Sequence, residues 1–169
     1  MNFIQEFIPT FNEIYQFISN NNEEVSFSYK SQLLETDFKT ILSNNLQKDR
    51  YFGYTSFGVH KEDYVFEIGN KPLKKLGSQG QQKTFLISLK LAQFKHIESK
   101  TNTKPILLLD DIYDKLDSHR INQLMSKICE GEYGQVFITD TNTERLPTFF
   151  KDKNYECFSF EIKDGSLNS

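Results

Sequence analysis

The sequence predicts an α/β fold in which parallel core strands are flanked by helices. Two observations predict it: a uniformly apolar run over 106–109, and an amphipathic helix pattern over 121–128 that precedes a strand pattern over 135–139. Strand, helix and strand in succession imply a parallel sheet with a helical crossover. The apolar run is typical of a central strand covered on both faces. Ligands of such open sheets bind beyond the carboxyl ends of the strands, so chemistry is expected just after residue 109.

Length and composition limit the class of protein. The chain has 169 residues, of which 37% are hydrophobic and 25% charged, and this suits one globular unit. A membrane helix needs about 20 apolar residues in succession, and the sequence has no such run. The first residues also lack a basic region followed by an apolar stretch, so we expect a cytoplasmic protein. Because the net charge is −3, any contact with DNA requires a local basic patch.

The first residues carry a helical pattern, with apolar side chains at spacings of three and four over 3–18. Pro9 lies inside this pattern and has no amide proton, so we expect a kink or break there. Thr10 and Glu13 would then form a capping box for a second helix through Ser19. The asparagines that follow are expected to end it.

Shorter elements are predicted between residues 25 and 70: a strand exposed on one face, a short helix, two strands joined by a polar turn, and a second turn. The exposed strand is expected at 25–30 and the short helix at 38–42. The two joined strands are expected at 51–57 and 64–68, with their turn at 58–63, and the second turn is expected at Gly69–Asn70. The carboxyl-terminal pattern predicts a last strand over 155–162 before a turn at Asp164–Gly165.

A glycine-containing loop over 77–83 leads into a helix over 84–98 whose apolar residues indicate burial over much of its girth. At its start, Ser78, Gly80 and Gln81 suit an anion. Glycine lets backbone amides approach, the helix dipole favours negative charge, and the serine hydroxyl adds a donor. Phosphate is the natural ligand. The alternative is an ordinary turn in which Ser78 is the N-cap.

Asp110 and Asp111 directly follow the apolar run. Paired charges at the end of a buried strand are costly unless they are compensated, and Mg²⁺ is the simplest compensation. One carboxylate would hold the metal and the other would orient a water. The alternative is that both aspartates cap the next helix, although Asp117 or Ser118 are the expected caps.

The remaining metal-ligand and thiol residues indicate no site. Cys129 and Cys157 lie far apart and belong to no paired motif, and His60, His96 and His119 have no partner at ligand spacing.

The order of these parts resembles the carboxyl half of an ABC-type ATPase head, as in ABC transporters and SMC proteins. Within that superfamily the chain looks most like the RecF DNA repair proteins of bacteria. The resemblance runs through nearly the whole chain and is strongest from 53 to 141. It is carried by the stretches 53–55, 58–63, 76–83, 107–111 and 114–117 and by the strand that closes on Thr139. It implies that 1–50 form part of helical lobe II, and that 51–169 form the carboxyl-terminal part of lobe I.

The resemblance implies a role for each matching residue. Ser78, Gly80 and Gln81 match the signature motif, which closes on the γ-phosphate held by a partner subunit. Asp110 matches the Walker B aspartate near Mg²⁺. Asp111 stands where many ABC ATPases have the glutamate that positions water, and its shorter side chain implies slow hydrolysis. Asp117 matches the D-loop aspartate at the dimer interface.

Several positions depart from the family pattern. Asp140 stands where transporters have a histidine that senses the γ-phosphate, and His60-Lys61 stands where the family usually has His-Arg, with a structural turn as its expected role. Lys83 is a basic residue just after the signature, with a solvated helix charge as the alternative. The chain contains no G-x-x-x-x-G-K-S/T loop, so only half a nucleotide site is encoded. The chain therefore resembles the carboxyl half of such a protein, as a fragment, a split subunit or a decayed gene.

By resemblance the expected cofactors are ATP and Mg²⁺, and the expected partners are DNA, a second copy through ATP-sandwiched heads, and recombination mediator proteins. The expected processes are replication, recombinational repair at gaps or single-/double-strand junctions, and the SOS response. Slow ATPase activity is expected only with a complementing half. Lys71, Lys74 and Lys75 form the basic stretch for the DNA backbone, with solvated lysines as the alternative. The alternative function is a noncatalytic interaction module.

Overall fold

The computed structural model describes residues 2–31, 37–142 and 157–168. Its helices are α1 (Asn2–Ser19), α2 (Phe38–Phe52), α3 (Leu73–Leu76), α4 (Gln79–Thr101) and α5 (Ser118–Cys129), with a 3₁₀ turn at Val59–Lys61. Its strands are β1 (Val25–Lys30), β2 (Asp63–Ile68), β3 (Lys71–Pro72), β4 (Leu107–Leu109), β5 (Val136–Ile138), β6 (Glu161–Lys163) and β7 (Ser166–Asn168). Among these described helices, none has the length and apolarity needed to cross a bilayer.

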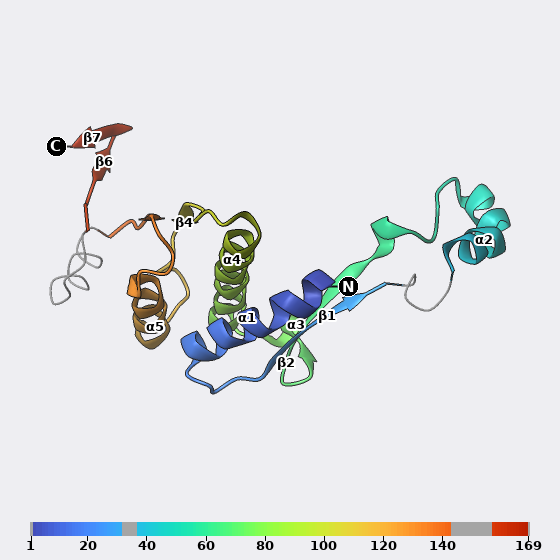
Figure 1. Ribbon diagram of the computed structural model, residues 1–169, viewed down its shortest axis with the longest axis horizontal. Helices are drawn as coiled ribbons and strands as arrows, with labels where there is room; N and C mark the ends of the chain where they lie inside the picture. The colour runs from blue at the N-terminus through green and yellow to red at the C-terminus, as the bar shows by residue number, and fades with distance from the viewer. Residues whose placement is uncertain (1, 32–36, 143–156, 169) are drawn as a thin grey trace.

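The strands form three small sheets. β1, β2 and β3 make an antiparallel sheet, β4 pairs with β5 in parallel, and β6 pairs with β7 as a hairpin. Because α5 connects β4 to β5, the predicted parallel pair with a helical crossover is confirmed. In Figure 1 the molecule is long, with α2 near one end, the β6–β7 hairpin near the other, and α1, α4 and α5 between them.

The core lies where α1 packs against α4 and α5. Its fully buried side chains come from all three helices and from the turn after α5, and they include Tyr15, Leu91, Leu124, Met125 and Tyr133. The core thus joins residues from both of the segments expected as separate lobes. The division at residue 50 stays a prediction.

The predicted break at Pro9 is wrong. α1 continues through Pro9 to Ser19, so Thr10 and Glu13 lie in mid-helix and begin no second helix. A proline inside a helix costs about 3 kcal/mol. Phe7, Phe11 and other side chains on the same stripe are buried, and each contributes about 1.5–3 kcal/mol, which offsets that cost. The asparagines end the helix as predicted, because Asn20 and Asn21 have φ of 57° and 56°.

The predicted strand over 51–57 is also wrong. The helix predicted near 38–42 extends as α2 to Phe52 and ends at Gly53, whose φ is 74°. Beyond it, the Asp49 carboxylate accepts hydrogen bonds from the backbone N–H (2.9 Å) and hydroxyl (2.6 Å) of Ser56 and folds the chain back. The partner of β2 is instead β1, in a register that pairs Phe27 with Phe66.

Other predicted elements are confirmed or extended. The strand over 25–30 is β1, and its central Phe27 is buried between exposed neighbours. The turn at Gly69–Asn70 joins β2 to β3. The buried helix predicted over 84–98 is longer than expected, since α4 begins at Gln79 and ends at Thr101. At the carboxyl end the predicted turn at Asp164–Gly165 joins β6 to β7, but the predicted last strand is wrong over 157–160, which form no strand, because β6 begins only at Glu161. Residues 155 and 156 of the predicted last strand lie outside the described residues.

The expectation that the apolar run is covered on both faces is wrong for this chain. Leu107 and Leu109 are buried, but Ile106 and Leu108 are 59% and 65% exposed, and Phe137 on β5 is 47% exposed. In the described residues β4 pairs with β5 alone, so one face of this two-stranded sheet lies on the core and the other is open.

Candidate functional site

The start of α4 is held by a capping box. The Ser78 hydroxyl accepts a hydrogen bond from the Gln81 backbone N–H (3.2 Å), and the Gln81 side-chain oxygen accepts one from the Ser78 backbone N–H (2.8 Å). The alternative role of Ser78 as an N-cap is therefore confirmed. This role leaves the phosphate hypothesis open, because Ser78 is exposed and a helix start has more amide groups than one cap satisfies.

Gly80 brings this helix start against the turn that precedes α5. A Cβ added at Gly80 would lie 3.1 Å from the backbone oxygen of Lys115, tighter than ordinary van der Waals contact. Lys115 itself has a φ of 66°. The glycine therefore permits a close approach between the signature segment and the segment between Asp111 and Asp117.

Asp110 and Asp111 lie beyond β4, beside Thr139, which directly follows β5 (Val136–Ile138). The backbone N–H of Thr139 donates to Leu109 O at 3.0 Å. The Thr139 hydroxyl donates to Asp110 Oδ1 and accepts from the Asp111 backbone N–H at 3.1 Å. Sequence reasoning assigned Thr139 only to the end of a strand. The available signal was its position, because carboxyl ends of parallel neighbours meet at one edge.

Lys83 connects α4 to the second aspartate. Its Nζ donates to the backbone oxygen of Asp111 at 3.1 Å, so it does more than carry a solvated charge. Asp111 has a φ of 48°, an uncommon left-handed conformation for a residue other than glycine. The hypothesis that the two aspartates cap the next helix is wrong, because α5 begins at Ser118 and its cap is Asp117.

The aspartate pair fits the donor set that Mg²⁺ uses. Mg²⁺ takes one or two carboxylates and completes its shell with water and phosphate oxygens. Asp110 and Asp111 are exposed, and in the described part of the chain no hydrogen bond or ion pair reaches the Asp111 carboxylate. No group of three or more His, Cys, Asp or Glu side chains gathers as a metal site within those same residues. The residues present therefore suit a metal that is shared with phosphate, and do not suit a closed protein site.

Asp117 caps α5 with both carboxylate oxygens. Oδ1 accepts from the Arg120 backbone N–H at 2.9 Å, and Oδ2 accepts from Arg120 Nε at 3.2 Å. The hydrogen bond from the Arg120 backbone lowers the pKa of Asp117, and the nearby guanidinium adds to this effect.

Two residues that the sequence analysis missed lie behind this site. Glu23, in the loop after α1, forms an ion pair with Arg120 of α5 at 2.6 Å, and both side chains are largely buried at 13% and 15% exposure. Glu23 also accepts from Gln81 Nε2 at 2.9 Å and from the Tyr15 hydroxyl at 2.6 Å. Burial opposes ionisation of Glu23, but the hydrogen bonds from Arg120, Tyr15 and Gln81 outweigh it and lower its pKa. Neither residue belongs to a motif, so no signal in the sequence pairs them.

Several of the remaining basic and histidine positions of the predictions have simple surroundings. Lys71, Lys74 and Lys75 are exposed on β3 and α3. The His60 Nε2 lies 3.1 Å from the backbone oxygen of Thr55, which agrees with the structural turn expected there. Within the described part of the chain, neither Cys129 nor Cys157 forms a disulfide.

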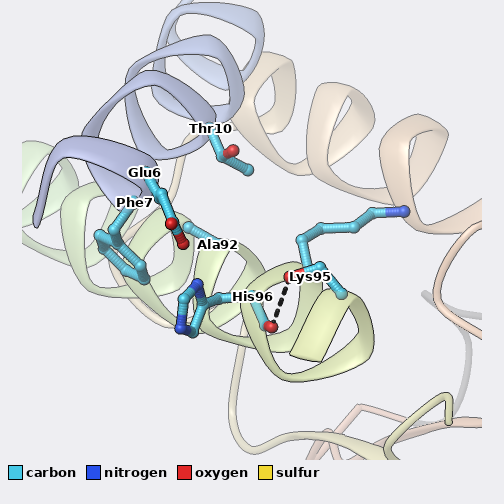
Figure 2. A pocket seen from close by; sticks show the side chains of 7 residues that line it. Glu6, Phe7, Thr10, Ala92, Lys95 and His96 are labelled. Carbon is cyan, nitrogen blue, oxygen red and sulfur yellow. Dashed lines mark hydrogen bonds between the residues drawn. The ribbon is translucent and has the colours of Figure 1, made fainter. Parts of the chain in front are cut away.

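A small cavity of about 120 Å³ lies between α1 and α4, lined by residues of both helices including Glu6, Phe7, Lys95 and His96 (Figure 2). None of the predicted site residues lines it. Ala92 at this cavity follows Ser78 by 14 positions, which is about 20 Å along the helix. The cavity is therefore separate from the candidate site.

Comparison with known proteins gives a consistent result. No protein-family model matches the chain. A "DNA replication and repair protein RecF" of Flavobacterium johnsoniae is 47% identical over 159 residues, which are 93% of this chain and 44% of that relative. The chain thus spans less than half the length of the curated relatives it matches.

Solved structures agree in fold. Two structures of the recombination mediator protein RecF in the RecFOR pathway, one described as RecF-ATPrS and the other as RecF-ATP, are 28% and 27% identical, with TM-scores of 0.71 and 0.69. Each match includes 99% of this chain and 44% of the RecF chain. A structure from work on SMC ATPases has a TM-score of 0.60 at 13% identity, over 99% of this chain and 84% of that one, and shows likeness of fold. The predicted ABC-type ATPase-head fold is confirmed.

Proposed function

Because this chain is homologous to the carboxyl-terminal portion of RecF DNA replication and repair proteins, we propose that it supplies the signature, Walker B and D-loop half of an ATP-dependent head. One observation carries the proposal: two segments distant in sequence, 78–83 and 110–117, meet at one place. Gly80 abuts Lys115, and Lys83 binds the Asp111 backbone, so the helix start, the two acids and the D-loop turn form one surface.

Each residue has a defined task in this proposal. Ser78 and the amides near Gly80 and Gln81 meet the γ-phosphate of a nucleotide held mainly by a second subunit. Asp110 holds Mg²⁺, which would neutralise phosphate charge when bound. Asp111 orients the attacking water, and its short side chain keeps hydrolysis slow. Asp117 lies at the interface between the two heads.

Nucleotide binding in this proposal requires a part that supplies a phosphate loop, since the 169 residues contain none. The relatives are more than twice as long as the matched segment, which supports the idea that such a part completes the head. In this proposal the completed head forms a homodimer closed by ATP and binds DNA gaps and junctions through Lys71, Lys74 and Lys75. It associates with recombination mediator proteins and acts in replication, repair and the SOS response. Its location is the cytoplasm.

The proposal is tested by reconstituting the head and measuring its mass in solution with and without ATP. The chain is co-expressed with the phosphate-loop portion of a RecF relative, and light scattering follows dimer formation. Ser78→Arg should abolish the ATP-dependent dimer, because a bulky side chain at the helix start blocks the phosphate. Ser99→Arg, at the exposed far end of the same helix, is the matched control and should dimerise normally. A dimer that forms equally without ATP, or that survives Ser78→Arg, would contradict the proposal.

A second candidate function is a noncatalytic interaction module. The open face of the β4–β5 sheet favours it, because this face exposes Ile106, Leu108 and Phe137. Exposed apolar surface of this kind marks sites of interaction with other molecules. Binding of DNA by this chain alone, with an affinity that ATP does not change, would support the module over the enzyme.

A further inference from the structure

The Glu23–Arg120 ion pair connects the two helix starts that carry the candidate site. Glu23 accepts two hydrogen bonds from the guanidinium, from Nη2 at 2.6 Å and from Nη1 at 3.3 Å. On one side of the pair, Gln81 donates to Glu23 and belongs to the capping box with Ser78. On the other side, Arg120 Nε donates to Asp117. An unbroken chain of hydrogen bonds therefore runs from Ser78 at the start of α4 to Asp117 at the start of α5.

Thr84 adds a second connection between the same helices. Its fully buried hydroxyl accepts from Arg120 Nη1 at 3.0 Å and donates to the backbone oxygen of Gly80 at 2.8 Å. Arg120 is therefore joined to the Ser78–Gln81 segment by two routes, one through Thr84 and the other through Glu23 and Gln81. Because a guanidinium is planar with donors in a rigid fork, it transmits position as well as charge.

The burial of this pair argues for a positioning role. Removing two charges from water costs free energy. Their attraction offsets this cost only if their geometry is good and their remaining donors and acceptors are satisfied. Here Glu23 receives hydrogen bonds from Arg120, Gln81 and Tyr15, and Arg120 reaches Thr84 and Asp117 as well. A change in the placement of either helix start would leave buried polar groups unpaired, so the network favours a single arrangement of the two.

We propose that Glu23 and Arg120 are positioning residues that set the start of α4 relative to the start of α5, and so hold the Ser78–Gln81 segment and Asp117 in one geometry. In the proposed function, on which this inference rests, both segments must face the same partner head. The loop after α1 thus takes part in the site through Glu23 although it contains none of the family motifs.

The first test uses the 169-residue chain alone and measures amide hydrogen exchange residue by residue. Glu23→Gln and Arg120→Lys should each raise exchange at both helix starts, near Gln81 and near Arg120, by about tenfold, as expected when a hydrogen bond to a charged group is lost. The middle of α4 should keep its protection. Glu24→Gln and Arg50→Lys make the same chemical changes at exposed positions and should alter neither helix start.

Two results of this test would overturn the proposal. One is a rise confined to the loop after α1, because the pair would then stabilise that loop alone. The other is a rise spread evenly along α4 and α5 in both variants, because that marks a general loss of structure. The double variant Glu23→Gln/Arg120→Lys provides a further check, since residues acting as a unit should raise exchange no more together than either does alone, and additive increases would contradict the proposal.

The second test separates this inference from the proposed function. In the reconstituted head, Arg120→Lys should raise the ATP concentration needed for dimerisation, while Arg50→Lys leaves it unchanged. If the unsubstituted head fails to dimerise with ATP, the proposed function fails, whereas the exchange results on the chain alone still decide whether the pair couples the helix starts. If Arg120→Lys dimerises at the same ATP concentration as the unsubstituted head, the positioning role is overturned.

Discussion

Two ion pairs with the same N···O distance of 2.6 Å lie near the two ends of α4: one joins Glu23 of the loop after α1 to Arg120 of α5, and the other joins Glu6 of α1 to Lys100 of α4. At the amino-terminal end, Glu23 and Arg120 are largely buried, at 13% and 15% exposure. At the carboxyl-terminal end, Glu6 and Lys100 are about half exposed, at 49% and 54%, beside the small cavity of Figure 2. The N···O distance therefore does not distinguish the two ion pairs. They differ in their burial and in the number of further hydrogen-bond partners.

The difference indicates where the fold demands a defined geometry. The buried pair is surrounded by Tyr15, Gln81, Thr84 and Asp117, and its loss leaves several polar groups without partners. An exposed pair that separates regains water on both sides, so its contribution is small. The end of α4 that carries the candidate site is thus the end with the constrained network.

The largest expected effect comes from breaking the buried pair. Glu23→Gln should lower the free energy of unfolding by up to about 3–5 kcal/mol, because it removes the buried counter-charge of Arg120 and leaves only the more exposed carboxylate of Asp117. Urea unfolding followed by circular dichroism measures the change, with Glu24→Gln as the control that should stay within about 0.5 kcal/mol. A loss of equal size in both variants would remove the distinction between buried and exposed sites.

Acidification should reduce that difference. Since the pKa of Glu23 is lowered in the folded chain, its ionised form contributes stability above its ordinary value of 4.5, and this contribution is lost as the pH falls through the lowered pKa. The wild-type chain should therefore exceed Glu23→Gln in stability by a constant amount near pH 7, and by progressively less below about pH 4.5. The groups facing Glu23 are Tyr15, Gln81 and Arg120, and none of them changes charge in this range. A difference that grows on acidification would contradict the assignment.

A smaller effect is expected from the hydroxyl that joins the network. Thr84→Val keeps the shape of the side chain and removes the hydrogen bonds to Gly80 and Arg120, and it should cost about 1–3 kcal/mol. Ser99→Ala removes a hydroxyl that bonds to the His96 backbone at the exposed end of the same helix, and should cost less than about 0.5 kcal/mol. Thermal unfolding of both variants makes the comparison. Equal costs would mean that the two ends of α4 are equally constrained.

The smallest effect is expected for the exposed pair. Glu6→Gln should lower stability less than any substitution above, and moderate salt should screen this effect while leaving that of Glu23→Gln largely unchanged. Stability measured for both variants at low and high ionic strength tests this. If salt reduced the stability change of Glu23→Gln as much as that of Glu6→Gln, the network would be more accessible to solvent than its burial indicates.

Much of the candidate site could be predicted because it is built from local patterns. A serine at the start of a helix pattern and an aspartate before an amphipathic run each indicate an N-cap, and both caps are present, at Ser78 and Asp117. An aliphatic run that ends in two acids placed Asp110 and Asp111 at the carboxyl end of a strand in a parallel pair. These patterns depend on hydrogen bonds and periodicity within a few residues. They can therefore be recognised in the sequence without knowledge of the tertiary structure.

The mistaken predictions concern segments where distant contacts overrule local preference. Pro9 breaks an isolated helix, yet α1 continues because its apolar stripe is buried against α4. The aromatic residues at 51–57 favour a strand, yet they end α2, and β2 pairs with β1 instead. Such outcomes depend on which surfaces meet in three dimensions.

By itself, then, the order of residues determined the parallel strand pair, the cap at Asp117, the positions of the acids and the likeness to one family of ATPase heads. Only the tertiary structure decided that Glu23 would reach Arg120 across 97 positions of sequence, that Thr139 would join the two acids, and that one face of β4 would stay open. The physical reason is range. Caps and periodicity act between near neighbours, whereas a buried ion pair exists only after packing has brought its two partners together and excluded the water around them.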